Sequence, residues 1–103
     1  MSVPVIRTAE ARADLRRILA YFLDQNEPAV AARFLAAHEE SLTLIGQSPE
    51  LGSPWASDEK YLSNLRVKPI RGFEKYLVFF RLSAQCVYIV RVFHGHQDIE
   101  NLL

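Results

Sequence analysis

The hydrophobic positions follow a helical period over the first half of the chain. Between residues 9 and 25 apolar side chains recur every three or four positions, and most charged side chains fall on the opposite face. This spacing predicts an amphipathic helix over about residues 9–25. Thr8 is expected to cap its first turn, because a threonine oxygen accepts hydrogen bonds from the unpaired backbone N–H groups there. The apolar set is Leu15, Ile18, Leu19, Phe22 and Leu23.

A second helical pattern begins after a polar break at Gln25 and Asn26. Asn26 is expected to cap this helix, and Pro28 suits a first turn, where the missing N–H has no helical partner to lose. The pattern continues to about Gly46 or Gln47. Because the break is short, the two helices should form an antiparallel hairpin.

The remaining apolar positions predict strands. Residues 3–7 contain Pro4, which suits an edge strand, and residues 64–70 alternate between apolar and basic side chains. Residues 75–82 and 86–93 are apolar on both faces, as central strands are, with a turn over residues 83–85. Residues 48–61 are rich in proline and glycine and read as a loop, and the tail from residue 94 ends in a short amphipathic piece.

This order predicts an α+β fold, in which an N-terminal strand precedes an antiparallel helical hairpin packed on a small antiparallel sheet (β-α-α-β-β-β plus a C-terminal tail). A chain of 103 residues suits one domain, spanning residues 1–103.

Charge changes this picture, because the formal net charge of zero hides an asymmetry. Residues 1–59 carry five basic and nine acidic side chains, whereas residues 60–91 carry seven basic and one acidic. The sheet is therefore expected to be basic and to favour an acidic partner. The neutral total argues against general binding of nucleic acid.

The single cysteine, Cys86, excludes an intrachain disulfide and is expected to be a buried, inert thiol. The N-terminus lacks the pattern of a signal peptide, and no apolar stretch approaches the ~20 residues that span a bilayer. A cytoplasmic protein that does not bind membranes is expected.

Metal and cofactor chemistry find little support. His94, His96 and Asp98 follow one another at a strand end, but this spacing defines no settled ligand geometry. RNA cleavage is the serious enzymatic option, with Arg66 and Arg81 on phosphate and His94 as proton carrier. The alternative is that these side chains form only a solvated basic face. His38 is expected to be a partly buried or surface histidine.

Several segments in order resemble one known family. The stretch TAEARADLRRILAYFLDQN, with Asp14-Leu15 and Ile18, is similar to the first helix of RelE/ParE toxins of the ParE type, and AARFLAAHEESLTLI is similar to the second. SPELGSP resembles the turn that follows. RVFHGHQDI resembles the family ending V-x-H-x-x-R-D-I, except that Gln97 stands where the arginine is usual.

The resemblance implies a toxin of a type II toxin–antitoxin pair that binds and inhibits DNA gyrase and is neutralised by a ParD-like antitoxin. A heterotetramer or larger complex with the antitoxin would be consistent with it. No catalytic residues and no cofactor are then needed. The residues expected to contact the target are Arg66, Arg71, Arg81, Arg91 and His94. Those expected to contact the antitoxin are Leu15, Leu19, Phe22 and Trp55, although Trp55 could equally be a core residue.

Two alternatives stay open. RelE-type relatives cleave messenger RNA at the ribosome, and such proteins are usually strongly basic with a tyrosine near the C-terminus, whereas this chain is neutral and ends in NLL. The Gln97 departure also leaves room for a protein that binds an antitoxin but has lost toxicity.

Overall fold

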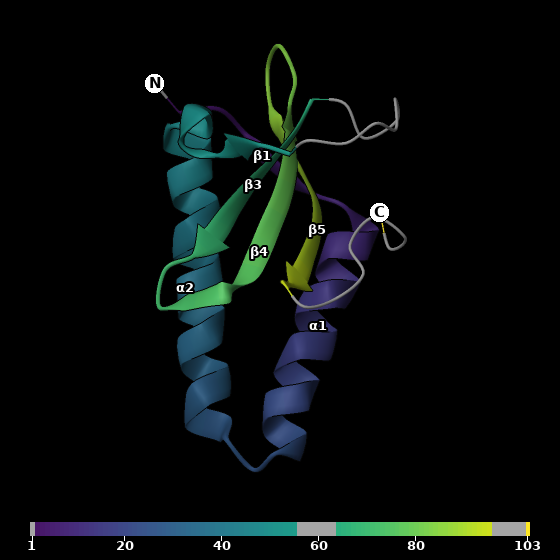
Figure 1. Cartoon of the computed structure of the whole chain (residues 1–103), viewed down its shortest axis with the longest axis vertical. Coiled ribbons are helices and arrows are strands. Elements are labelled where there is room, and N and C mark those ends of the chain that lie inside the picture. The colour runs from purple at the N-terminus through teal and green to yellow at the C-terminus, as the bar shows by residue number, and fades with distance from the viewer. Residues whose placement is uncertain (1, 56–63, 96–102) are drawn as a thin grey trace.

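Two long helices form one layer of the protein. The computed structural model describes residues 2–55, 64–95 and 103. Helix α1 (Ala9–Asp24) and helix α2 (Pro28–Gln47) run antiparallel as the expected hairpin and extend beyond the sheet toward the loop that joins them (Figure 1). Neither helix combines the length and apolar character needed to cross a bilayer.

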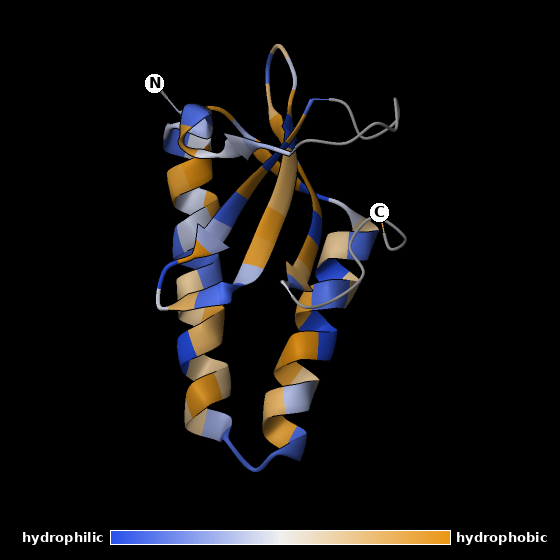
Figure 2. Ribbon diagram, viewed as in Figure 1, coloured by the Kyte–Doolittle hydropathy of each residue, from blue (hydrophilic) through white to orange (hydrophobic). Residues whose placement is uncertain are grey.

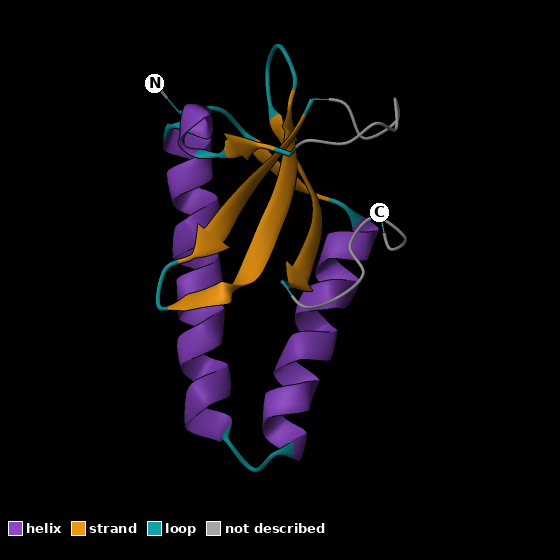
Figure 3. Cartoon of the chain, viewed as in Figure 1, coloured by secondary structure: helices purple, strands orange, loops and turns teal. Residues whose placement is uncertain are grey.

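A five-stranded sheet forms the second layer, in the order β1-β5-β4-β3-β2 (Figure 3). The long strands are β3 (Leu65–Ile70), β4 (Phe73–Leu82) and β5 (Val87–His94). Strand β1 (Val5–Arg7) lies at one edge, as Pro4 predicts, but it pairs in parallel with β5, so the sheet is mixed. A short 3₁₀ helix, η1 (Pro49–Leu51), and strand β2 (Ser53–Pro54) lie within the segment that reads as a loop.

The ends of the helices follow local chemistry. Thr8 caps α1 as expected, because its Oγ1 accepts a hydrogen bond from the Ala11 N–H at 3.1 Å. Asn26 does not cap α2. It adopts a left-handed conformation (φ 57°), which asparagine tolerates, and its N–H bonds back to the Leu23 carbonyl. Asn26 therefore closes the end of α1, and Glu27 stands at the cap position of α2.

The main core lies between the helices and one face of the sheet. Hydrophobic residues recur along both helices and along the long strands (Figure 2), and those of the main core pack against one another between the two layers. At its centre the Phe34 ring packs edge-on against Phe73 and Tyr76 at 5.1 and 5.0 Å between centroids. The buried members from the sheet are Ile70, Val78, Phe80, Val87, Ile89 and Val92.

A second, smaller cluster covers the opposite face of the sheet. Leu65, Phe79 and Phe93 are buried there, with Trp55 packed edge-on against Phe79 at 5.1 Å. The C-terminal Leu103 also packs on this cluster. Strands β4 and β5 are therefore apolar on both faces for a structural reason, which confirms the two-sided pattern of the sequence.

Cys86 differs from its expected place. It lies in the turn before β5, only half-buried, with its Sγ 3.2 Å from the Ser83 Oγ. The turn ends one residue later than the apolar run suggests, since β5 starts at Val87.

Candidate partner-binding surfaces

The Asp14 side chain of α1 hydrogen-bonds to the backbone of β5 at the part of its edge that β1 does not cover. Strand β1 pairs with β5 only as far as Ile89, so beyond this point no other strand of the described residues borders β5 on that side. The Asp14 carboxylate, 1% exposed, accepts a hydrogen bond from the backbone N–H of Val92 at 2.9 Å. The side chain thus supplies the acceptor that a neighbouring strand would otherwise provide.

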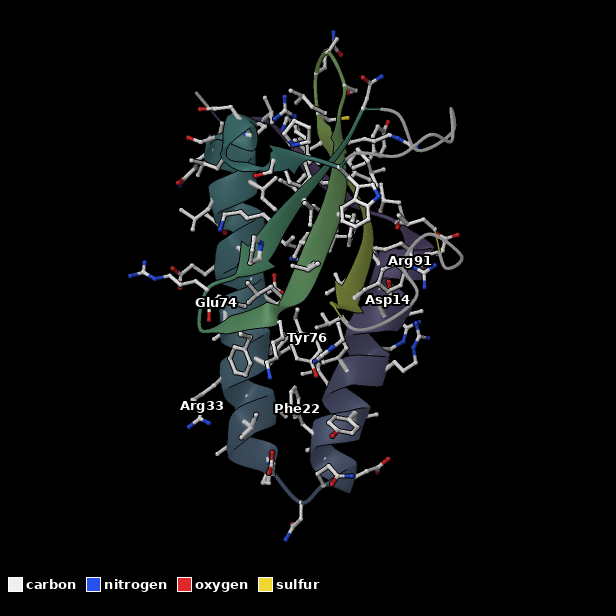
Figure 4. The ribbon with its side chains drawn as sticks, viewed as in Figure 1. Asp14, Phe22, Arg33, Glu74, Tyr76 and Arg91 are labelled. Atoms are coloured by element: carbon white, nitrogen blue, oxygen red, sulfur yellow. The ribbon has the colours of Figure 1, made fainter. Side chains whose placement is uncertain are left out.

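The same carboxylate binds Arg91. The Arg91 Nε and Nη2 atoms donate to the two Asp14 oxygens at 2.8 and 2.9 Å, and the two labelled side chains meet beside α1 (Figure 4). The Arg91 guanidinium also lies 4.4 Å from the centroid of the Phe93 ring. The hydrogen bonds to Asp14 raise the pKa of Arg91. Arg91, which the sequence analysis expects to contact the target, therefore binds Asp14 and joins β5 to α1.

A groove opens between the two helices, with a volume of about 350 Å³. Its apolar lining comes from α1, α2 and the sheet below them, and includes Leu15 and Ile89. Three arginines stand around it. The complete lining is Arg7, Ala11, Arg12, Leu15, Arg16, His38, Leu42 and Ile89.

The charged groups of the groove are unevenly paired. Arg7 forms a bidentate ion pair with Glu39, and this contact lowers the pKa of the Glu39 carboxyl. Arg12 and Arg16 are exposed and have no ion pair among the described residues. His38 is 2% exposed, and burial lowers its pKa. The groove therefore has an excess of positive charge.

The residues expected to contact an antitoxin do not share one surface. Leu15 lines the groove, and Leu19 is half-buried on the same helix. Phe22 is a core residue, 8% exposed, whose ring packs at 5.6 Å from that of Phe34 between the helices (Figure 4). Trp55 lies on the other face of the sheet, where it packs, partly buried, against the smaller cluster.

The three residues expected to cleave RNA are also separated. Arg66 lies opposite Phe80, and Arg81 lies opposite Leu65, in the pairing of β3 with β4. Phe80 and Leu65 belong to clusters on opposite faces of the sheet, so the two arginines point to opposite faces. His94 lies opposite Tyr76, five positions along β4 from Arg81 or about 17 Å.

The structure instead brings His94 into a pocket that the sequence did not indicate. Its volume is about 360 Å³, and its lining comes from α1, β4 and β5. The His94 ring packs edge-on against Tyr76 at 5.0 Å, and burial raises the pKa of Tyr76. The i, i+4 spacing of Arg17 and Tyr21 places them on one face of α1, but the sequence does not show that Tyr76 and His94 lie beside them. The lining residues are Arg17, Ile18, Tyr21, Tyr76 and His94.

The remaining candidates lie partly outside the described residues. His96, Gln97 and Asp98 are among these, so the histidine–aspartate cluster near the C-terminus is not tested. In the described ranges, no three His, Cys, Asp or Glu side chains gather as metal ligands would. Arg71 is exposed at the turn between β3 and β4, and the Arg66 side chain donates to the Gly52 carbonyl at 2.9 Å.

Comparison with solved structures defines the class. One similar structure is the chromosomal ParDE toxin–antitoxin system from P. aeruginosa, with a TM-score of 0.73 and 18% identity over 90% of this chain and 96% of that one. Another is the RelBE2 toxin–antitoxin complex from Mycobacterium tuberculosis, with a TM-score of 0.63 and 22% identity over 91% and 99%. The fold is therefore that of chains found in toxin–antitoxin complexes.

The sequence specifies the family within this class. Residues 5–99 match the model of the ParE toxin of the type II toxin–antitoxin system parDE. Because the match spans nearly the whole chain, this protein belongs to the ParE toxin family. No curated protein matches the chain in sequence.

Proposed function

We propose that this chain is a toxin that arrests growth by binding DNA gyrase, and that a cognate ParD-like antitoxin neutralises it in the cytoplasm. Membership of the ParE family supports the toxin role. The observation that favours binding over cleavage is the dispersal of Arg66, Arg81 and His94 over two faces and about 17 Å of the sheet. Groups this far apart cannot act together on one phosphate.

The proposed target surface is the basic part of the sheet. Arg71, exposed at the β3–β4 turn, is the leading contact, and Arg81 on the outer face is a further candidate. His94 is a further candidate at the end of β5. Attraction between these cations and an acidic patch of the target would speed association and weaken as salt increases.

The proposed antitoxin surface is the groove between the helices together with the exposed part of α1. Leu15 and Leu19 are the anchors that remain accessible, and burial of a few such side chains dominates affinity in many interfaces. Phe22 would support this surface from within the main core, whereas Trp55 lies on the other face of the sheet, away from this groove. A heterotetramer or larger assembly with the antitoxin is part of the proposal.

Expression of the chain alone tests the target. Gyrase inhibition predicts filamentous cells and an SOS response while protein synthesis continues. The double variant Arg71→Gln/Arg81→Gln should weaken this effect, whereas Arg33→Gln should not, because Arg33 points away from the sheet on α2 (Figure 4). An immediate stop of protein synthesis without the SOS response would contradict gyrase as the target.

The pocket of Tyr76 and His94 supports a second candidate, a ribosome-dependent ribonuclease. It places an imidazole, two phenols and the Arg17 guanidinium around one space, which are groups able to move protons and bind phosphate. Under this alternative, Tyr76→Phe and His94→Gln would each abolish toxicity and leave antitoxin binding intact. Full toxicity of both variants would exclude the ribonuclease at this pocket.

A further inference from the structure

The pocket of Tyr76 and His94 is rich in hydrogen-bond donors. Its polar lining consists of the Arg17 guanidinium, the Tyr21 and Tyr76 phenols and the His94 imidazole, and none of the described residues that line it is acidic. A guanidinium can only donate, and a phenol donates through its O–H group. Such a lining suits an anion with several acceptor oxygens better than it suits a cation.

Arg17 is held at this pocket by a buried carboxylate. Its Nη2 atom donates to Asp14, and this contact uses only one of the N–H donors of the guanidinium. Asp14 also binds Arg91, so two cations share one anion and the cluster retains a positive charge. Because the Arg17 side chain is already positioned, less conformational entropy is lost when a further anion binds it.

Tyr76 adds a hydroxyl donor of restricted orientation. Its burial and the nearby Tyr21 phenol raise the pKa of Tyr76, so its hydroxyl keeps its proton at neutral pH. The His94 ring packs edge-on against the Tyr76 ring, with 5.0 Å between the centroids, and limits how that ring can turn. The two phenols are close enough to interact, so both can donate to one ligand beside Arg17.

The apolar part of the pocket suits a flat ring. Ile18 and the rings of Tyr21 and Tyr76 line it, and its volume of about 360 Å³ exceeds what a phosphate group alone would fill. Sites for small organic ligands combine a mainly apolar and aromatic lining with a few polar groups that fix orientation. Aromatic side chains bind nucleobases by stacking, because every base has a flat π-face. The lining therefore matches a ligand that has both a base and a phosphate.

We propose that this pocket binds a mononucleotide whose phosphate is held by Arg17 and by the Tyr21 and Tyr76 hydroxyls. Its base lies against Ile18 and the aromatic rings. A phosphate monoester suits these donors better than a carboxylate does, because it has three terminal oxygens and a charge of about −1.5 to −2 at neutral pH. The inference concerns a small ligand and involves no cleavage, so it rests neither on gyrase as the target nor on a ribonuclease.

Isothermal titration calorimetry of the full chain with the common ribonucleoside monophosphates tests this site. At least one of them should bind with a Kd below about 1 mM, and about tenfold or more tightly than its nucleoside or inorganic phosphate. Arg17→Gln should weaken binding about tenfold or more, because it removes a charged donor. Tyr76→Phe should weaken it about threefold to tenfold, because it removes one neutral hydroxyl donor and keeps the ring.

Arg16→Gln is the matched control, since Arg16 is the neighbouring arginine of α1 and lines the groove between the helices instead of this pocket. Its effect on the Kd should stay below about twofold. Urea unfolding checks that Arg17→Gln is folded, and in this variant Asp14 keeps its bonds to Arg91 and to the Val92 N–H.

Three results of the titrations would overturn the inference. They are that no mononucleotide binds, that inorganic phosphate binds as tightly as the mononucleotides, or that Arg16→Gln weakens binding as much as Arg17→Gln does. A short single-stranded RNA or DNA that binds far more tightly than any mononucleotide, with the same dependence on Arg17, would also overturn it and would identify a nucleic-acid strand as the occupant.

A gyrase supercoiling assay on the same preparations keeps this inference separate from the proposed target. If a mononucleotide binds through Arg17 and Tyr76 while gyrase is unaffected, the inference stands and the proposed target fails. If gyrase is inhibited but no mononucleotide binds, the inference fails and the proposed target stands.

Discussion

Asp14 and Arg91 lie 77 residues apart in the sequence and form a bidentate ion pair at 2.8 and 2.9 Å that joins helix α1 to strand β5. Arg17 of the same helix also contacts this carboxylate. The Val92 N–H donates to it as well, at the place where β1 no longer covers the edge of β5. One buried side chain therefore connects the helical hairpin to the sheet and satisfies the backbone of an edge strand.

Replacing Asp14 with alanine should lower the free energy of unfolding by about 3 kcal/mol or more. The substitution leaves the Val92 N–H and the Arg91 guanidinium without their acceptor in a mostly buried place. Urea unfolding measures the loss, and Asp24→Ala, on the exposed end of the same helix, is the control expected to change little. A loss below about 1 kcal/mol would contradict the role given to Asp14.

His38 should make the protein less stable in mild acid. Burial lowers its pKa in the folded state below the ordinary 6.5, so the unfolded chain binds more protons as pH falls below this value. The free energy of unfolding should therefore decrease from about pH 6.5 downward and level off below the folded pKa.

Urea unfolding of the wild type and His38→Leu between pH 8 and 5 checks this expectation. The wild type should lose stability relative to the variant as the pH falls, because leucine does not titrate. The other histidines are present in both proteins and cancel in the difference. A difference that stays constant over this range would show that His38 does not titrate with folding.

Replacing Phe22 should mainly lower the stability of the fold and not the binding of a partner, because its side chain is buried in the core. Its ring packs against Phe34, Phe73 and Tyr76, so Phe22→Ala should cost about 3–5 kcal/mol through lost burial and the cavity left behind. Leu23→Ala, at a neighbouring position that is 56% exposed, should cost little. If both variants lost equally little free energy of unfolding, Phe22 would not be a core residue and would again be a candidate contact for the antitoxin.

The helices could be predicted because their signal is local. The period of apolar residues and the cap at Thr8 depend on neighbours within one or two turns, and both are observed. The parallel pairing of β1 with β5 could not be read in this way, because it joins Val5 to Val87. The prediction that Asn26 caps α2 was wrong, because an asparagine can either cap the start of a helix or end one in the left-handed conformation.

The same limit applies to the sites. A period of two places Arg66 and Lys68 on one face of a strand, but it does not say which face meets the helices when both faces are apolar. The sequence therefore allowed Arg66, Arg81 and His94 to be assigned to one ribonuclease site, but the sheet separates them in space. Conversely, the groove and the Tyr76–His94 pocket combine residues from several elements, so neither has a local signature.

Gly52 should not tolerate a side chain. A Cβ atom at this position would overlap the Cζ atom of the buried Phe80 ring and lie 2.7 Å from its Cε1 atom, and this ring cannot shift without disturbing the core. Gly52→Ala should lower the free energy of unfolding by about 1–3 kcal/mol. Ser53→Ala, at the next and exposed position, is the control, and equal stability of the two variants in urea would contradict this close contact.

The central claim, a toxin that binds gyrase and does not cleave RNA, is tested most directly with purified components. The chain is added to DNA gyrase with relaxed plasmid and, separately, to ribosomes translating a messenger RNA. The account predicts inhibited supercoiling or trapped gyrase–DNA complexes, relieved by the antitoxin, and intact messenger RNA. Unaffected gyrase together with messenger RNA cut at the ribosome would contradict it.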